Sequence, residues 1–199
     1  MNPRAFVLTV NRPIKRFDDT CNHLNSLGIE WEVFFGMDNQ KCRLQPFDTF
    51  DMDRAGERIG AKHIAATLTH YLLWKTMLYQ PQESFWSLEF DVRFVPDWQA
   101  QYNKAMSVMP DDWQIIFLGS CCCKGRETKH IGENVYEVHW PLCGHALQIR
   151  QNALPTLLDE HQHISMPLDI AMFHTSLRKL RTYTILPPIV VQADTIVAP

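Results

Sequence analysis

The sequence has no apolar run that approaches the roughly eighteen residues of a membrane-spanning helix. Its first apolar stretch is too short for the core of a signal peptide, and it ends at Asn11 and Arg12. It contains no internal repeat and no low-complexity tract. The net charge is only −3, so a chain-wide basic surface is excluded. These absences argue against a transmembrane segment and against nucleic acid as a partner.

What the sequence contains is the composition of an ordinary globular protein. Hydrophobic residues make up 46% of its 199 residues and charged residues 21%. Aromatic residues make up 11%, and burial of their large rings drives the formation of a compact core. Because this length suits one sizeable core, we expect residues 1–199 to form a single domain.

Six cysteines are present, but none has the C-x-x-C spacing of a metal or redox motif. Without a secretion signal they are interpreted as thiols in a reducing compartment, so we expect a cytoplasmic protein. Cys121, Cys122 and Cys123 are consecutive, an arrangement that suits neither one tetrahedral metal ion nor a disulfide between neighbours. We interpret them as thiols at the end of a strand. The alternative is a catalytic thiol activated by a histidine.

Segments typical of strands and helices alternate along the chain, which predicts an α/β layer architecture. Strand-like apolar runs lie at residues 5–10, 31–35, 85–88, 113–118, 135–139, 146–149 and 183–191. Helical patterns lie at 17–27, 59–79, 98–109, 152–161 and 168–178. We expect a loop over residues 40–58 and a loop or a short excursion over residues 121–134.

Two carboxylates follow the strand-like run at 85–88. Glu89 and Asp91 are separated by one residue, so in extended backbone their side chains point to the same side. Paired carboxylates suit a hard divalent ion such as Mg²⁺ or Mn²⁺, which commonly bridges to substrate phosphates. Ligands of open α/β sheets also bind beyond the carboxyl ends of strands. The alternative is a solvated acidic loop without a function.

The predicted helix at 59–79 carries a second stripe beside its apolar one. His63, Thr67, His70 and Trp74 follow each other at spacings of 4, 3 and 4 residues. The two histidines lack the i, i+4 spacing of a helical zinc pair. The stripe is either a polar seam that hydrogen-bonds neighbouring backbone or the wall of a site, and the spacing does not decide between them.

Asp169 follows Pro167, a residue that suits the start of a helix. This places the carboxylate in the first helical turn, where the helix dipole stabilises a negative charge. On spacing alone, helix capping is the favoured interpretation, and a functional carboxylate is the alternative.

Several passages of the chain, taken in order, are similar to the motifs of one enzyme family. They are VLTVNR at 7–12 with Arg16 behind it, GIEWEVF at 28–34 followed by GMD at 36–38, IGAK at 59–62 leading to Thr69, His70 and Trp74, LEFDVRF at 88–94, WQIIFLG at 113–119, MPLD at 166–169 and PPIVVQ at 187–192. On these passages, which cover nearly the whole chain, it resembles glycosyltransferase family 25. That family includes lipopolysaccharide-biosynthesis and procollagen galactosyltransferases.

The resemblance implies a GT-A-type, Rossmann-like fold that binds a nucleotide-sugar. It implies inverting transfer of a hexose such as galactose from a UDP-sugar donor to a glycan or protein acceptor. Mn²⁺ or Mg²⁺ at Glu89 and Asp91 would neutralise the leaving diphosphate, and Asp169 would take the proton of the acceptor hydroxyl. Contacts with the nucleotide-sugar are implied for Thr9, Asn11, Arg12, Arg16, Asp38, His70 and His145. Of these, His70 or His145 would face the diphosphate or add a metal ligand.

The chain departs from the family pattern at two informative places. The family's triplet of three acids is Glu89-Phe90-Asp91 here, so metal binding is weakened if the middle acid is a ligand and survives if the outer pair holds the ion. In the helix motif, Ala61 or Lys62 stands where a cysteine is expected. Phe90 leaves open a catalytically inactive binding or scaffold module. A nucleotidyltransferase is a third reading, and the lack of a Gly-rich basic loop after the first strand argues against it.

Overall fold

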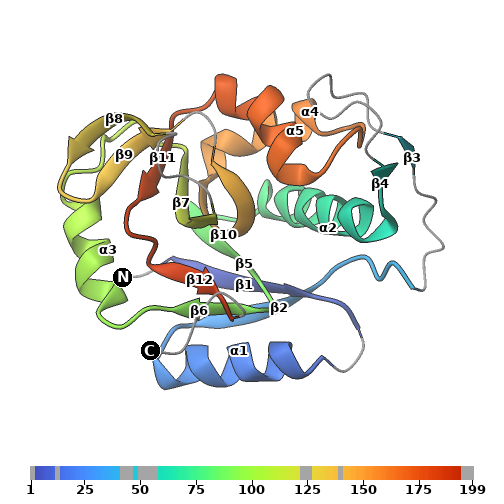
Figure 1. Cartoon of the computed structure of the whole chain (residues 1–199), viewed down its shortest axis with the longest axis horizontal. Coiled ribbons are helices and arrows are strands. Elements are labelled where there is room, and N and C mark those ends of the chain that lie inside the picture. The colour runs from blue at the N-terminus through green and yellow to red at the C-terminus, as the bar shows by residue number, and fades with distance from the viewer. Residues whose placement is uncertain are drawn as a thin grey trace.

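The computed structural model describes residues 3–11, 14–40, 47–48, 58–121, 127–138 and 141–193. Arg12, one of the expected donor-binding residues, lies outside the described residues, as do Cys122 and Cys123. The described chain forms a central β-sheet with helices packed against both faces (Figure 1). The α/β fold class predicted from the sequence is therefore confirmed.

Eight strands form the central sheet, in the order β2-β1-β5-β10-β7-β11-β9-β8. They are β1 (Arg4–Thr9), β2 (Trp31–Phe35), β5 (Ser84–Glu89), β7 (Ile115–Cys121), β8 (Glu127–Gly132), β9 (Val135–Val138), β10 (Leu142–Arg150) and β11 (Thr182–Ile185). β1 pairs in parallel with β2 and β5, and β7 with β11, whereas β10 and β9 run antiparallel to their neighbours. The carboxyl ends of β1 and β5 therefore meet at one edge of the sheet.

Two small antiparallel sheets accompany the central one. β6 (Val92–Phe94) pairs with β12 (Val190–Gln192), and β3 (Phe47–Asp48) pairs with β4 (Arg58–Ile59). The first pairing places the end of the described chain beside the segment that follows β5. Passages about a hundred residues apart in the sequence thus border the same edge of the central sheet.

The helices form a layer on each face of the sheet (Figure 1). One layer holds α1 (Lys15–Ser26) and α3 (Trp98–Met106), and the other holds α2 (Ala61–Met77), α4 (Leu154–Glu160) and α5 (Leu168–His174). Short 3₁₀ helices cover Gln151–Ala153 and Ser176–Arg178. Because both faces are covered, the middle of β5 is buried over four consecutive residues, as expected for a strand inside an α/β sheet.

Local chemistry explains several boundaries. α1 ends before Gly28, whose φ of +66° is the left-handed conformation that closes many helices. The loop expected over residues 121–134 is wrong in part, because β8 occupies Glu127–Gly132. The strand expected at 183–191 with an interruption at Pro187 and Pro188 is divided there into β11 and β12, which pair in different sheets. β6 was not predicted, since three residues carry too little pattern.

Candidate functional site

Two adjoining cavities lie at the edge of the sheet where β1 and β5 end. The first, of about 290 Å³, is bordered by the ends of both strands and by the first half of α2. The second, of about 390 Å³, is bordered by α2, the start of β10, the start of α5 and the end of β12. They share a wall formed by Lys62, Ala66, His70 and Glu89. The cavities are therefore two compartments of one site.

The first cavity has largely apolar sides and a few polar groups. Leu8, Val10 and Phe90 contribute apolar surface, and Thr9 and Asn39 contribute polar atoms. The Thr9 side chain is only 4% exposed, and its hydroxyl has no hydrogen-bond partner within the described part of the chain. Such a lining suits a ligand with a flat apolar portion and a polar rim.

Glu89 is the carboxylate of the shared wall, and a buried histidine lies beside it. His70 is almost fully buried, and its Nε2 lies 3.8 Å from Glu89 Oε1. On its other side, His70 Nδ1 lies 3.4 Å from the hydroxyl of Ser87. Burial pushes the pKa of Glu89 upward, but the adjacent His70 and the charge of His145 hold that pKa below its ordinary value. Glu89 therefore remains an anion in the wall between the cavities.

The second cavity contains Asp169 and His145. Asp169 lies in the first turn of α5, where its Oδ2 accepts a hydrogen bond of 3.1 Å from the backbone N–H of Cys143. His145 is buried, and its Nε2 lies 3.5 Å from the carbonyl oxygen of Val190. Burial lowers the pKa of His145, and the charge of Glu89 opposes that shift only in part. Asp169 borders a cavity and ties α5 to β10.

Cys143 also borders the second cavity, and it is disulfide-bonded. The expectation that the cysteines are thiols is therefore wrong at this position. β10 pairs with β7, with Leu142 opposite Cys121, so the fold places two cysteine-bearing segments side by side. The spacing of the cysteines in the sequence does not reveal that β7 and β10 are paired. Cys21 is a free, buried thiol, as expected.

The remaining residues expected at the site lie outside both cavity linings. Arg16 and Asp91 form an ion pair with 3.9 Å between Nη1 and Oδ2. Asp38 is buried and accepts a hydrogen bond of 3.0 Å from the backbone N–H of Gln40. Asn11 is described but borders neither cavity. The structure thus brings together one group of the expected residues, namely Thr9, His70, Glu89, His145 and Asp169.

One side chain that both cavities share, Glu89, is suited to bind a divalent cation. In the described ranges, no group of three or more His, Cys, Asp or Glu side chains is arranged to hold a metal ion. Mg²⁺ and similar ions are nevertheless often bound by one or two carboxylates while substrate phosphates and water complete their shell. Glu89 offers such a carboxylate to both cavities, whereas Asp91 faces Arg16.

Sequence reasoning gave no binding role to many of the residues that line the cavities, and four of them matter for the chemistry of the site. They are Asn39, Lys62, Phe90 and Gln192. For Lys62 a signal existed: it precedes Ala66 and His70 by four and eight residues, so the three share one face of α2. For Gln192 the sequence offers no such signal, because the position of this residue depends on the pairing of β12 with β6.

Comparison with known proteins assigns no family. No protein-family model and no curated protein matches the chain. Of solved structures, a glycosyltransferase involved in glycosylation of the major capsid of PBCV-1 has a TM-score of 0.47 and 9% identity, covering 91% of this chain and 80% of that one.

Two further solved structures have similar scores. A mutant Drosophila β1,4-galactosyltransferase 7 in complex with manganese, UDP-Gal and xylobiose has a TM-score of 0.49 and 10% identity, over 96% and 71% of the two chains. Mannose-1-phosphate geranyltransferase from Thermus thermophilus has a TM-score of 0.45 and 10% identity, over 92% and 73%. Likenesses this distant assign no activity, so the residues of the chain itself must carry any proposal.

No helix in the described part of the chain has both the length and the apolar character needed to cross a membrane.

Proposed function

We propose that the chain is a nucleotide-sugar-dependent glycosyltransferase that moves a hexose from a UDP-sugar to a glycan or protein acceptor with inversion. The observation that carries this proposal is the pair of cavities that meet at the wall of Lys62, Ala66, His70 and Glu89. A transferase must hold a donor and an acceptor side by side, with the reacting carbon between them. Two adjoining compartments that share these four residues are suited to that arrangement.

The first cavity is proposed to bind the donor. It lies beyond the carboxyl ends of β1 and β5, the usual ligand position of an open α/β sheet. Its apolar sides suit a nucleobase, and the Thr9 hydroxyl and the Asn39 amide suit a ribose. Contacts of Asn11, Arg12, Arg16 and Asp38 with the donor stay predictions.

The second cavity is proposed to bind the acceptor, with Asp169 as the base. Inverting displacement requires the base and the leaving group on opposite sides of the reacting carbon. Asp169 borders only the second cavity, whereas the proposed donor cavity lies on the other side of the shared wall. The carboxylate of Asp169 would accept the proton of the acceptor hydroxyl as that oxygen attacks the sugar.

Glu89 is proposed to hold a divalent cation together with the diphosphate of the donor, and Asp91 as a second ligand stays a prediction. When bound, Mn²⁺ or Mg²⁺ would stabilise the negative charge that develops on the leaving diphosphate. His70 is proposed to orient the Glu89 carboxylate, from which its Nε2 is 3.8 Å away, and Ser87 is placed to hold the ring of His70. The cytoplasmic location expected from the sequence likewise stays a prediction.

Thermal denaturation with a panel of nucleotides tests the proposal. UDP and UDP-hexoses with Mn²⁺ should raise the melting temperature, because a ligand that binds only the native state stabilises it. Glu89→Gln should reduce the part of the shift that needs Mn²⁺, and Glu83→Gln, which alters a carboxylate outside both cavities, should not. If no nucleotide or nucleotide-sugar shifts the transition with or without metal, the proposed function is wrong.

A catalytically inactive binding module is the second candidate, and Phe90 is the observation that favours it. Its ring borders the first cavity at a position where the resemblance predicts an acid. Such a module would bind UDP-sugar but would not release UDP from it. Slow hydrolysis of the donor without an acceptor, measured as UDP release, separates the two candidates.

A further inference from the structure

Lys62 is placed where a donor and an acceptor would meet. It is the second residue of α2, its side chain is exposed, and it borders both cavities. It forms no ion pair with any other residue that the structure describes. Its ammonium group is therefore available to a ligand.

The charges around the cavities favour a cationic side chain at this wall, whether or not a metal ion is bound at Glu89. The described lining contains two carboxylates, Glu89 and Asp169, and Lys62 is its one permanently cationic side chain. Arg16, which lies outside both linings, is paired with Asp91. A nucleoside diphosphate brings at least two further negative charges, so it would meet repulsion from Glu89 unless a positive group lies beside it.

We propose that Lys62 binds the diphosphate of the donor at the shared wall, contacting the group that leaves when the hexose is transferred. This inference rests on the proposed function and names a residue that it does not assign. Lysine suits the role because its ammonium group is a compact point charge with three donors on a flexible stem. The contact would persist as charge builds on the leaving diphosphate, so Lys62 would support both binding and transfer.

Calorimetric titration of three variants tests the inference. The probes are uridine, UMP, UDP and inorganic pyrophosphate, each measured in EDTA and again with Mn²⁺. Lys62→Met should weaken UDP and pyrophosphate binding by about ten- to a hundredfold, the effect of one lost charge-assisted contact, and leave uridine binding unchanged. Lys62→Arg should retain most of the affinity. Lys75→Met, an exposed lysine on the same helix that borders neither cavity, is the matched control.

The outcomes separate this inference from the proposed function. If UDP binds the wild type and Lys62→Met equally well, the inference is wrong while the donor site stands. If pyrophosphate binds through Lys62 but no nucleotide binds, the diphosphate contact stands and the proposed function is wrong. If none of the four probes binds under either condition, both are wrong. A loss of uridine binding in Lys62→Met would also overturn the inference, because it would show a general disturbance of the cavity.

Discussion

At the scale of single residues, Asp169 is held by backbone groups on both of its oxygens. Oδ2 accepts a hydrogen bond from the Cys143 N–H, and Oδ1 accepts one of 2.9 Å from the N–H of Ile170. These contacts fix the carboxylate against the second cavity without neutralising it with a cation. A base that must accept a proton from a substrate benefits from that fixed orientation.

Asp169→Asn should abolish most transfer while sparing the donor. An amide cannot accept the proton of the acceptor hydroxyl, so we expect the rate to fall by about a hundredfold to ten-thousandfold. UDP affinity should stay unchanged, because Asp169 does not border the first cavity. Product formation and calorimetric titration measure the two effects, and Asp159→Asn on the exposed face of α4 is the control. Full activity in Asp169→Asn would refute the assignment of the base.

Gly119 shows how a missing side chain permits the geometry of the site. A Cβ atom at this position would lie 2.2 Å from the carbonyl oxygen of Val190 and 2.4 Å from Nε2 of His145. Gly119→Ala should therefore displace His145 and lower the free energy of unfolding by about 1–3 kcal/mol, as overpacking does. Urea denaturation measures the change. Gly132→Ala is the control, because its new Cβ would come no closer than 3.5 Å to Val108. Equal stability of the two variants would contradict the prediction.

The sequence could identify some site residues because local rules placed them. Glu89 ends a strand and Asp169 begins a helix, and both positions follow from patterns a few residues long. Asp91 was expected beside Glu89 because alternate residues of a strand share a face. β5 ends at Glu89, however, and the turn that follows breaks this alternation, so Asp91 meets Arg16 instead. To assign Lys62 to the site, one must also know which face of α2 borders a cavity.

At the scale of elements, the strands with an apolar sequence could be predicted and those without one could not. β5 and β7 are apolar because helices cover both of their faces. β8 has the sequence ETKHIG and lies at the edge of the sheet, so it lacks the apolar pattern that marks a strand. The position of β12 beside β6 depends on a long-range pairing, which no local pattern encodes.

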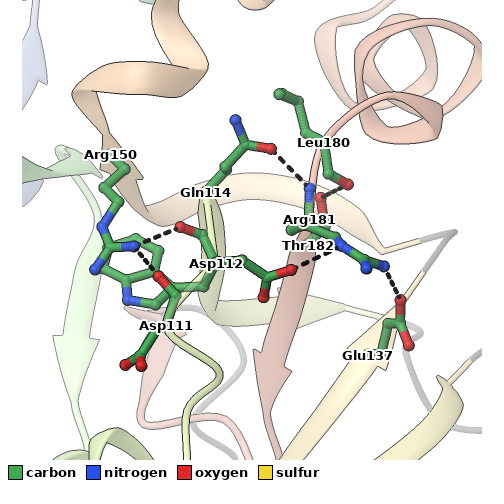
Figure 2. Close-up of polar contacts among 9 residues, drawn as sticks. Asp111, Asp112, Gln114, Glu137, Arg150, Leu180, Arg181 and Thr182 are labelled. Atoms are coloured by element: carbon green, nitrogen blue, oxygen red, sulfur yellow. Dashed lines mark hydrogen bonds and ion pairs between the residues drawn. The ribbon is translucent and has the colours of Figure 1, made fainter.

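A polar network joins the elements at the amino ends of β7 and β11 (Figure 2). Arg150 is 21% exposed, stacks 4.4 Å above the ring of Trp113, and donates hydrogen bonds to the carbonyl oxygens of Asp111 and Trp113. Arg181 is 59% exposed and pairs with Asp112 at 3.0 Å and with Glu137 at 3.5 Å. The two arginines carry the same charge in very different surroundings.

Arg150→Ala should therefore cost far more stability than Arg181→Ala. The first removes a stacked cation and its bonds to two carbonyl groups, for which we expect about 2 kcal/mol. The second removes exposed ion pairs, for which we expect about 0.5 kcal/mol that 1 M salt would largely screen. Urea denaturation at low and high salt measures both. Arg150→Lys should lie between, because lysine keeps the charge but not the planar fork. A larger loss in Arg181→Ala would contradict this ranking.

At the scale of the whole molecule, the candidate site and the polar network lie at opposite ends of the strands of the central sheet. The candidate site borders the carboxyl ends of β1 and β5, and the network of Arg150 and Arg181 lies at the amino ends of β5, β7 and β11. Stability and binding should accordingly respond to separate sets of substitutions. Histidines lie at the candidate site and elsewhere in the fold, and burial lowers the pKa of the half-buried His23 and of the buried His145 and His161.

The whole protein should lose stability as the pH falls below neutrality, and His161 should be a main cause. Burial lowers its pKa to about 4 in the folded chain, whereas a histidine in the unfolded chain titrates near its ordinary value of 6.5. Between these values the unfolded state binds the additional proton, so its contribution is complete above about pH 6.5 and is lost towards pH 4, amounting to about 3 kcal/mol. Urea denaturation across this window measures the slope. His161→Gln, which can still bond to the hydroxyl of Ser176, should flatten the slope, and His163→Gln on the exposed surface should not. Identical slopes for wild type and His161→Gln would show that another group controls the acid sensitivity.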